Sequence, residues 1–201
     1  GYTCTSAEDI VELKCQDIII PQNCADKFLK VTQYVDELLH EMYGLQGYYN
    51  CTKIEDLFGQ LAMGIAPHTS GAILCRIIGV AEIKGHYGHP YFHAAKRRNC
   101  DGDIDSIILL LDGLINFSRL FLPGNRGGLM DAPLILTTRI DPSEIDKEAH
   151  NVDINWEYPI KFYELTQSIP DAKTAITEGG IKTVTSVLGT PAQYQGFGFT
   201  H

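Results

Sequence analysis

The sequence predicts an α+β protein, and three observations lead to that class. Residues 23–44 carry apolar side chains at helical spacing. Residues 9–20, 72–83 and 132–139 are apolar and rich in β-branched side chains, which is typical of strands. The chain has 201 residues, of which 44% are hydrophobic and 20% charged, so it is long and apolar enough to bury a core.

The first predicted strand runs directly into the first predicted helix. Asp9–Ile20 alternates in polarity and then becomes continuously apolar, and Pro21 is expected to end this strand. Asn23 is expected to cap the helix that follows, and Gly44 fits its C-terminal stop. The apolar positions of this helix are Phe28, Val31, Val35, Leu38, Leu39 and Met42.

The middle of the chain contains further elements of both kinds. Thr52-Lys53-Ile54-Glu55 has the form of a capping box and predicts a second helix through about Met63. Ala72–Ile83 predicts a strand. Gly85–Asn99 is rich in glycine, histidine and aromatic residues, and we expect it to mix strand and loop.

The second half begins with a predicted helix over Ile107–Leu120. Ala132–Arg139 then predicts a strand, and Asp141-Pro142 is expected to start a short acidic helix. Phe162–Leu188 has weaker helical signals, which Pro170 and Gly179-Gly180 interrupt. The apolar face of the first of these helices comprises Ile107, Leu110, Leu111, Leu114, Phe117 and Leu120.

Charge and cysteine usage narrow the class of protein. The formal net charge of −9 argues against a broadly basic surface for nucleic acid. No signal segment is visible, and the longest apolar run, Ile107–Leu111, is far too short to span a membrane. The six cysteines form no CxxC pair, and Cys15 and Cys75 lie in core-like settings, which favours reduced thiols in a cytoplasmic protein. The abrupt ends indicate a piece of a longer polypeptide.

Residues 99–105, the acidic segment, are the most informative feature of the chain. Carboxylates occupy every second position, at Asp101, Asp103 and Asp105. In an extended loop such side chains point the same way, roughly 6.5–7 Å apart along the backbone, and can converge on one or two divalent cations. The basic triplet Lys96-Arg97-Arg98 precedes the segment. Alone it would be a solvated surface run, but beside carboxylates it favours contact with phosphates.

The acidic segment is also compatible with two simpler roles. Its carboxylates would be favoured at the N-terminus of the helix predicted next, so the segment could be a capping turn and nothing more. A calcium loop would use Asp101, Asp103 and Asp105 as its first ligands and Asp112 as its twelfth residue. Ser106, however, replaces the glycine that such a loop needs for its sharp turn.

Two more clusters are candidates for a site. His86, His89 and His93 are separated by glycine and Pro90, which break the helix that would align them, so we expect packing or phosphate contact rather than a metal. Arg126-Gly127-Gly128 is a turn by default, although glycines beside a guanidinium also suit a phosphate.

The order of these motifs resembles the large subunit of archaeal family D DNA polymerase. The block His89–Asp103 is similar to the catalytic block of that family. The resemblance continues in five further segments, Ile10–Lys14, Ala66–Ser70, Asn116–Arg119, Arg126–Leu134 and Thr137–Pro142. It thus covers nearly the whole chain.

The resemblance implies a fold and an activity. The fold is a double-psi β-barrel of the RNA-polymerase type with surrounding helices, and residues 1–201 are a single catalytic-core fragment that contains the metal-binding barrel. The activity is template-directed transfer of dNTPs to a primer 3′-hydroxyl in DNA replication. We expect the isolated fragment to have little or no activity, because the family's second barrel supplies lysines to the same active site.

The resemblance also implies roles for particular residues. Asp101 and Asp103 would coordinate two Mg²⁺ ions, one activating the 3′-hydroxyl and one stabilising the leaving pyrophosphate, with Asn99 at the edge of the site. Ile104 stands where the family usually has an acidic residue, so the part played by Asp105 is open. Leu129 likewise replaces a basic residue. The residues expected near nucleotide or DNA phosphates are Lys96, Arg97, Arg98 and Arg126.

The partners implied are primer–template DNA, a dNTP, the small exonuclease subunit and, through other parts of the polypeptide, the sliding clamp. No membrane is involved, and the expected location is the cytoplasm of an archaeal cell, associated with the nucleoid. Two alternatives from other classes are a non-enzymatic calcium-binding module and a nucleotidyltransferase closer to RNA polymerase.

Overall fold

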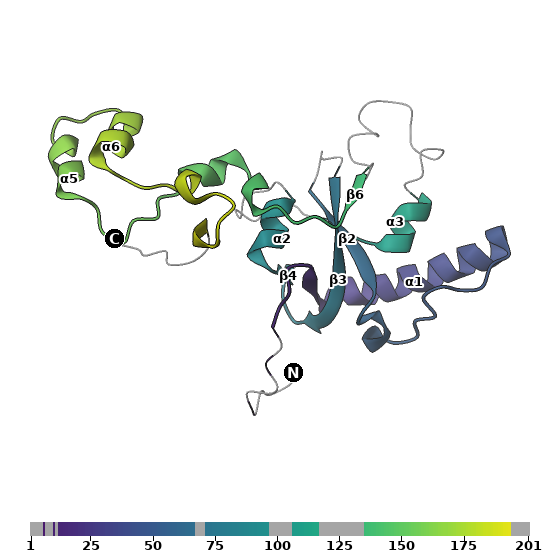
Figure 1. The fold of residues 1–201 in the computed structure, drawn as a ribbon. Coiled ribbons are helices and arrows are strands. Elements are labelled where there is room, and N and C mark those ends of the chain that lie inside the picture. Colours follow the sequence, from purple (N-terminus) through teal and green to yellow (C-terminus); the bar gives the residue numbers. More distant parts are fainter. Residues whose placement is uncertain are drawn as a thin grey trace. The chain divides into compact units, whose positions relative to one another are not determined.

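The computed structural model describes residues 6, 10, 12–66, 71–96, 106–116 and 135–193 (Figure 1). The chain divides into two compact units. We call residues 1–92 and 104–140 the sheet unit, and residues 93–103 and 141–201 the C-terminal unit. The described elements include both helices and strands, which confirms the mixed α+β class.

Six strands of the sheet unit form one mixed sheet. They are β1 (Asp17–Pro21), β2 (Leu61–Ile65), β3 (Gly71–Ala81), β4 (Tyr87–Gly88), β5 (Ser106–Leu109) and β6 (Ile135–Thr137). The strand order is β4-β1-β3-β2-β5, and β6 pairs with β3. Both β1 and β6 run parallel to β3, whereas β2 is antiparallel to β3 and to β5. The double-psi barrel stays a prediction, because the order found among the described strands is open.

The central strand β3 uses both of its edges. Arg76 pairs with Asp17 of β1 and with Leu61 of β2, so these two strands lie on opposite edges of β3. Parallel neighbours and burial on both faces produce continuous apolar sequences, which is why β1 and β3 were correctly expected as strands. Fully buried side chains around the sheet include Ile18, Ile20, Leu57, Ile77 and Leu109.

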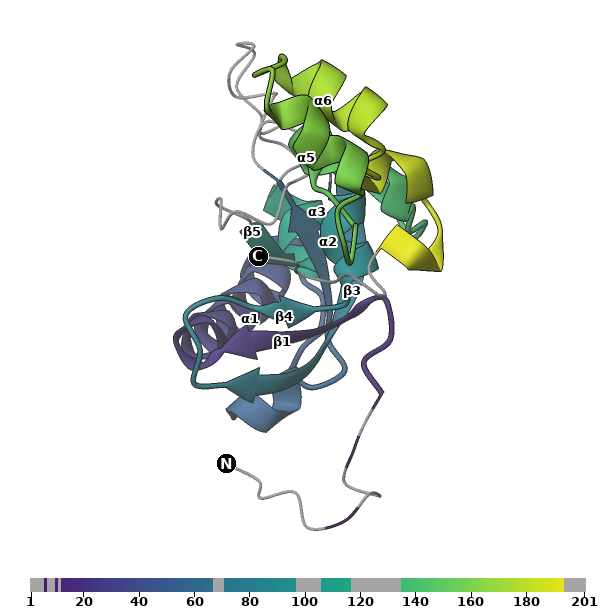
Figure 2. The same cartoon turned by 90° about the vertical axis from the view of Figure 1, so that its left-hand side faces the viewer.

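Helix α1 (Gln22–Tyr43) lies against β1 and β3 (Figures 1 and 2). It ends as predicted, since Gly44 adopts a left-handed backbone with φ 62°. The prediction that Asn23 caps it was wrong, because Pro21 holds the N-cap position and no side chain caps the helix. Met42 is 70% exposed rather than part of the buried face. The buried residues of α1 are Ala25, Phe28, Thr32, Val35 and Leu39.

The second predicted helix is much shorter than expected. Only Ile54–Leu57 is helical, as the 3₁₀ turn η2, and residues 61–63 belong to β2. The turn itself is held by Asp56, whose carboxylate accepts hydrogen bonds from the amides of Thr52 and Lys53 at 2.9 and 3.1 Å. Strand β2 is hydrogen-bonded on both sides, to β3 and β5, and this pairing outweighs the helical preference of Leu61-Ala62-Met63.

The predicted helix over residues 107–120 is wrong in its first part. Ser106–Leu109 forms β5, paired with β2, and the helix α3 covers Leu110–Asn116. Two consecutive isoleucines suit a pleated strand better than a helix once a partner strand is available. The acidic segment is therefore followed by a strand, and the expectation that it caps a helix was wrong.

Other boundaries also differ from the expected ones. Within the described part of residues 9–20, only residues 17–20 are extended, since a turn joins the amide of Asp17 to the carbonyl of Lys14 at 3.0 Å. Residues 85–99 contain β4 and a helix, α2 (Pro90–Ala95), that was not expected. Proline at the first position starts α2 rather than breaking it, because that position needs no amide donor.

Short helices make up the described part of the C-terminal unit. They are η3 (Pro142–Glu144), η4 (Lys147–Asn151), α5 (Ile160–Thr166), α6 (Ala172–Gly179), η5 (Val184–Val187) and η6 (Pro191–Gln193). The predicted start at Asp141 is confirmed, because its carboxylate accepts the Ser143 amide at 3.1 Å. The predicted interruptions are confirmed as well: Pro170 lies between α5 and α6, and Gly180 ends α6 with φ 76°.

The predictions about membrane spans and about cysteines can be compared with the structure only for the described residues. None of the described helices is long and apolar enough to cross a membrane. Cys15, Cys24, Cys51 and Cys75 form no disulfide bond in the described part of the chain, and Cys4 and Cys100 lie outside it.

Candidate active site

Most of the predicted site lies outside the described residues. This holds for the whole acidic segment with Asn99, Asp101, Asp103 and Asp105. It also holds for Arg97, Arg98 and Arg126. The structure does, however, place the strands that follow these segments in the sequence, β5 and β6.

The strand that follows the acidic segment, β5, and the strand that follows Arg126 in the sequence, β6, begin at the same end of the sheet. Ser106 follows the acidic segment and pairs with Ile65 at the last position of β2. Ile135, the first residue of β6, pairs with Gly71 at the start of β3. The strands there are ordered β6-β3-β2-β5. The first residues of β6 and β5 are therefore three strand spacings apart, which amounts to roughly 15 Å.

Lys96 is the one predicted phosphate ligand within the described residues. It follows α2 directly and is 2% exposed, so it is not part of a solvated surface run. The helix before it buries Phe92, Ala94 and Ala95. A lysine buried this deeply needs compensating polar contacts, because an isolated ammonium loses its hydration. At Lys96, therefore, the basic triplet is buried and not exposed to solvent.

The histidine cluster packs against aromatic rings. The ring of His86 lies edge-on to Phe92 at 6.5 Å between centroids, and His89 lies edge-on to Tyr91 at 4.7 Å. His89 Nδ1 also accepts the Tyr91 amide at 3.1 Å, which fixes its orientation at the start of α2. No group of three His, Cys, Asp or Glu side chains within the described ranges is placed to hold a metal. For His86 and His89, packing is one of the two roles that the sequence favoured, and phosphate contact was the other.

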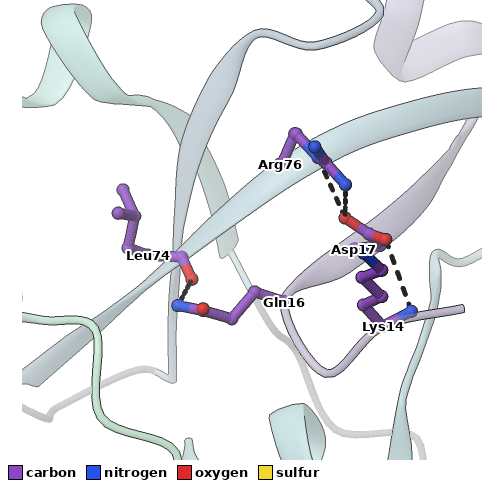
Figure 3. A network of polar contacts seen from close by, with 5 residues as sticks. All are labelled: Lys14, Gln16, Asp17, Leu74 and Arg76. Atoms are coloured by element: carbon purple, nitrogen blue, oxygen red, sulfur yellow. Dashed lines mark hydrogen bonds and ion pairs between the residues drawn. The ribbon is translucent and has the colours of Figure 1, made fainter.

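Carboxylates in the sheet unit are neutralised by the protein itself. Asp17, only 5% exposed, accepts from Nε and Nη2 of Arg76 at 3.0 and 2.7 Å and from the Lys14 amide at 3.3 Å (Figure 3). Beside this pair, Gln16 Nε2 donates to the carbonyl oxygen of Leu74 at 3.0 Å. This network joins β1 to β3 and has a structural role.

A metal site needs carboxylates that are not already paired with a guanidinium or with backbone amides. The carboxylate of Asp56 is engaged by amide hydrogen bonds, chiefly from Thr52, which hold the pKa of this carboxyl below its usual range. In the sequence, Asp101 and Asp103 alternate after a basic triplet, and carboxylate oxygens are the kind of ligand that Mg²⁺ prefers.

One contact near the candidate site was not expected from the sequence. The hydroxyl of Tyr49 accepts the amide of Leu111, at the start of α3, at 3.0 Å. The two residues are 62 positions apart, and no pattern in the sequence connects them. Tyr49 thereby contacts the helix that follows β5 from a distant part of the chain.

These features define an α+β protein in which an acidic segment of the sequence, preceded by a basic triplet, is followed directly by β5, the last strand in the order of the described sheet. The family model of the catalytic domain of the DNA polymerase II large subunit DP2 matches residues 1–201. The chain belongs to this family.

Individual relatives agree with the family match. The DNA polymerase II large subunit of Methanococcoides burtonii is 53% identical over 201 residues, which are 100% of this chain and 17% of that protein. The Pyrococcus furiosus large subunit is 52% identical over 100% of this chain and 16% of its own length. That of Methanosarcina barkeri is 53% identical over 96% of this chain and 17% of its own length. The chain thus spans about a sixth of these relatives.

Proposed function

We propose that this chain is part of the active site of a DNA-directed DNA polymerase, which adds dNTPs to a primer 3′-hydroxyl during replication. The observation that supports this most strongly is the family match over residues 1–201, together with relatives of about half-identical sequence that are named DNA polymerase II large subunit. Because the chain spans only 17% of such a relative, the activity belongs to the complete enzyme.

Within that enzyme, Asp101 and Asp103 hold two Mg²⁺ ions, with Asn99 at the edge of the site and Asp105 available as a further ligand. Bound there, Mg²⁺ supplies charge neutralisation for the phosphates and a lowered pKa for the primer hydroxyl. The proposal is supported by the chemistry of the donor set and by β5, whose pairing with β2 fixes the position of Ser106 directly after the segment.

The cationic residues near this segment bind phosphates. Arg97 and Arg98 orient the triphosphate or the primer–template backbone through bidentate contacts, and Arg126, which precedes β6 in the sequence, adds a further phosphate contact. Lys96, the first residue of the triplet, is buried and contributes positive electrostatic potential at the phosphates.

The proposal extends to the finer architecture. We propose that the mixed sheet is part of a double-psi β-barrel of the RNA-polymerase type, and that residues 1–201 are one catalytic-core piece of the large subunit. A second barrel, supplied by another part of the polypeptide, completes the active site, so the chain alone is inactive. The small exonuclease subunit and the sliding clamp bind elsewhere on the enzyme, which acts on DNA at the archaeal nucleoid.

The decisive test is substitution of the metal ligands in the complete polymerase. We expect Asp101→Asn or Asp103→Asn to lower primer extension more than about 100-fold, because even the outer partners of metal ligands contribute 10- to 100-fold. Asp26→Asn is the matched control, since Asp26 lies exposed on α1 and accepts from Nε2 of Gln22, also on α1, at 3.3 Å. Full activity of either segment variant would remove these residues from catalysis.

A calcium-binding module is distinguished by calorimetry. Tight Ca²⁺ binding that needs Asp112 would favour the module, whereas weak Mg²⁺ binding that strengthens with a nucleotide favours the polymerase. The family match supports the polymerase.

A further inference from the structure

The chain reverses from strand to helix directly behind the acidic segment. Strand β5 ends at Leu109, and α3 begins at Leu110 without an intervening loop. The first amides of a helix have no acceptor within the helix. One of them, that of Leu111, donates to the hydroxyl oxygen of Tyr49 at 3.0 Å. Tyr49 therefore fixes the point at which the chain turns.

Tyr49 is itself held rigidly. It is 6% exposed, and burial is the largest cause that raises the pKa of its phenol to about 12, so the hydroxyl is neutral at physiological pH. The carboxylate of Asp36, in the middle of α1, accepts the amides of Tyr48, Tyr49 and Asn50 at 2.7, 2.9 and 2.6 Å. The backbone at Gly47 passes so close to Asp36 that an added Cβ would lie 3.1 Å from Cγ.

The helix α3 is also fixed on its other side. At Gly113 an added Cβ would lie 2.5 Å from Cε of Met63, so α3 approaches β2 as closely as a glycine permits. Met63 pairs in turn with Ile108 of β5. The junction of β5 and α3 is thus held between β2 and Tyr49.

We propose that Tyr49 is a positioning residue for the acidic segment. This inference rests on the proposed function, in which the segment binds Mg²⁺. Because β5 has only four residues, a shift of the start of α3 is transmitted along the strand to Ser106 and to the carboxylates just before it. The contact that the structure gives for the Tyr49 hydroxyl is with the amide of Leu111, so Tyr49 acts through Leu111 and β5.

The test uses the complete two-subunit polymerase with Tyr49→Phe, which removes only the hydroxyl. We expect the Mn²⁺ concentration for half-saturation, measured by electron paramagnetic resonance without nucleotide, to rise about tenfold, as for other outer-shell changes. The Mg²⁺ concentration for half-maximal primer extension should rise in parallel, and primer–template affinity should stay unchanged. A role in stability alone would lower the melting temperature and leave both metal requirements unchanged, and that result would overturn the proposal.

Tyr48→Phe is the matched control. Tyr48 is the neighbouring residue, its ring lies edge-on to that of Tyr49 at 4.9 Å, and it is 60% exposed. Its hydroxyl is not needed by α3, so both metal requirements should remain those of the unmodified enzyme. A rise equal to that of Tyr49→Phe would contradict the proposal.

Two further variants keep the test decisive. Asp36→Asn removes the acceptor of the Asn50 amide but not the Tyr49 hydroxyl, and we expect a smaller rise in the same metal requirements. It replaces Tyr49→Phe if that variant folds poorly. Asp101→Asn is assayed in parallel: if it is inactive while Tyr49→Phe keeps normal metal requirements, only the inference on Tyr49 fails. If Asp101→Asn is active, the proposed function itself fails.

Discussion

The sheet unit and the C-terminal unit are stabilised by contacts of different range. In the sheet unit, strands far apart in sequence pair with each other, as Asp17 does with Arg76, 59 positions away. In the C-terminal unit, three aspartates each cap a short helix within two or three residues: Asp141, Asp146 and Asp171. The sheet unit therefore depends on strand pairing between distant segments, whereas the C-terminal unit combines local helix caps with individual distant contacts, such as that of the Gln193 side-chain amide with the carbonyl oxygen of Pro142 at 2.9 Å.

This difference suits the proposed function. Metal ligands must be held within a fraction of an ångström, and a sheet with fixed register holds the residue after the acidic segment in that way. Short capped helices open more easily, since their stability comes from few buried contacts. We expect β5, which begins directly after the acidic segment, to be the precisely held attachment of the site, while Asp101 and Asp103 themselves are assigned to the C-terminal unit.

The largest difference between the units is expected from a core truncation. Ile77 of β3 is 0% exposed, so Ile77→Ala should lower the free energy of unfolding of the sheet unit by about 2–5 kcal/mol. In the C-terminal unit Ile160 is 76% exposed, and Ile160→Ala should change stability by no more than about 0.5 kcal/mol. Hydrogen exchange of the complete large subunit, resolved by peptide, measures both. Equal effects would contradict the comparison.

An intermediate effect is expected from the ion pair of the sheet. Arg76→Ala leaves the carboxylate of Asp17 buried without its guanidinium and should cost about 1–3 kcal/mol. Asp17→Asn should cost less, because the Arg76 side chain is 48% exposed and water can solvate it. Exchange rates of β1 and β3 peptides give both values. A larger cost for Asp17→Asn would contradict the expectation that the buried carboxylate is the poorly solvated partner.

The smallest effect is a pH dependence confined to α6. The hydroxyl and amide of Thr174 donate to Asp171 and hold the pKa of its carboxyl below 3.8, the usual value. A lowered pKa in the folded state stabilises α6 above the ordinary pKa, and this stabilisation is lost as the pH falls through the folded value. Hydrogen exchange of residues 172–179, corrected for intrinsic rates, should show this loss in acid.

Asp171→Asn is the control for this pH dependence. Asparagine also caps helices but does not titrate, so α6 should keep its protection while losing the acid-dependent step. A step of the same size in both proteins would assign the effect to another group.

The two units also differ in how well the sequence predicted them. Pro170 and Gly180 mark the limits of α5 and α6 correctly, because a missing amide and a left-handed backbone act at the residue itself. The same holds for Gly44 at the end of α1. In the sheet unit, residues 61–63 and 107–109 were predicted as helix and are strands.

The two wrong predictions have one physical cause. The strands β2 and β5 pair with each other, so each provides the hydrogen bonds that make the other extended. Neither segment contains its partner, and a local pattern of apolar residues does not distinguish a helix packed on a sheet from a strand within it. α2 was missed for a related reason, because Pro90 was taken as a helix breaker although it occupies the first helical position.

By itself, the sequence determined the chemistry of the candidate site. Alternating carboxylates after a basic triplet favour a divalent cation next to phosphates wherever the segment lies, since charge and spacing belong to the residues themselves. Only the tertiary structure decided what surrounds that chemistry. The strand pairing brings the starts of β5 and β6, which follow the acidic segment and Arg126 in the sequence, to one end of the sheet. Folding also places the Tyr49 hydroxyl against α3. Such contacts join residues far apart in sequence, so no local pattern records them.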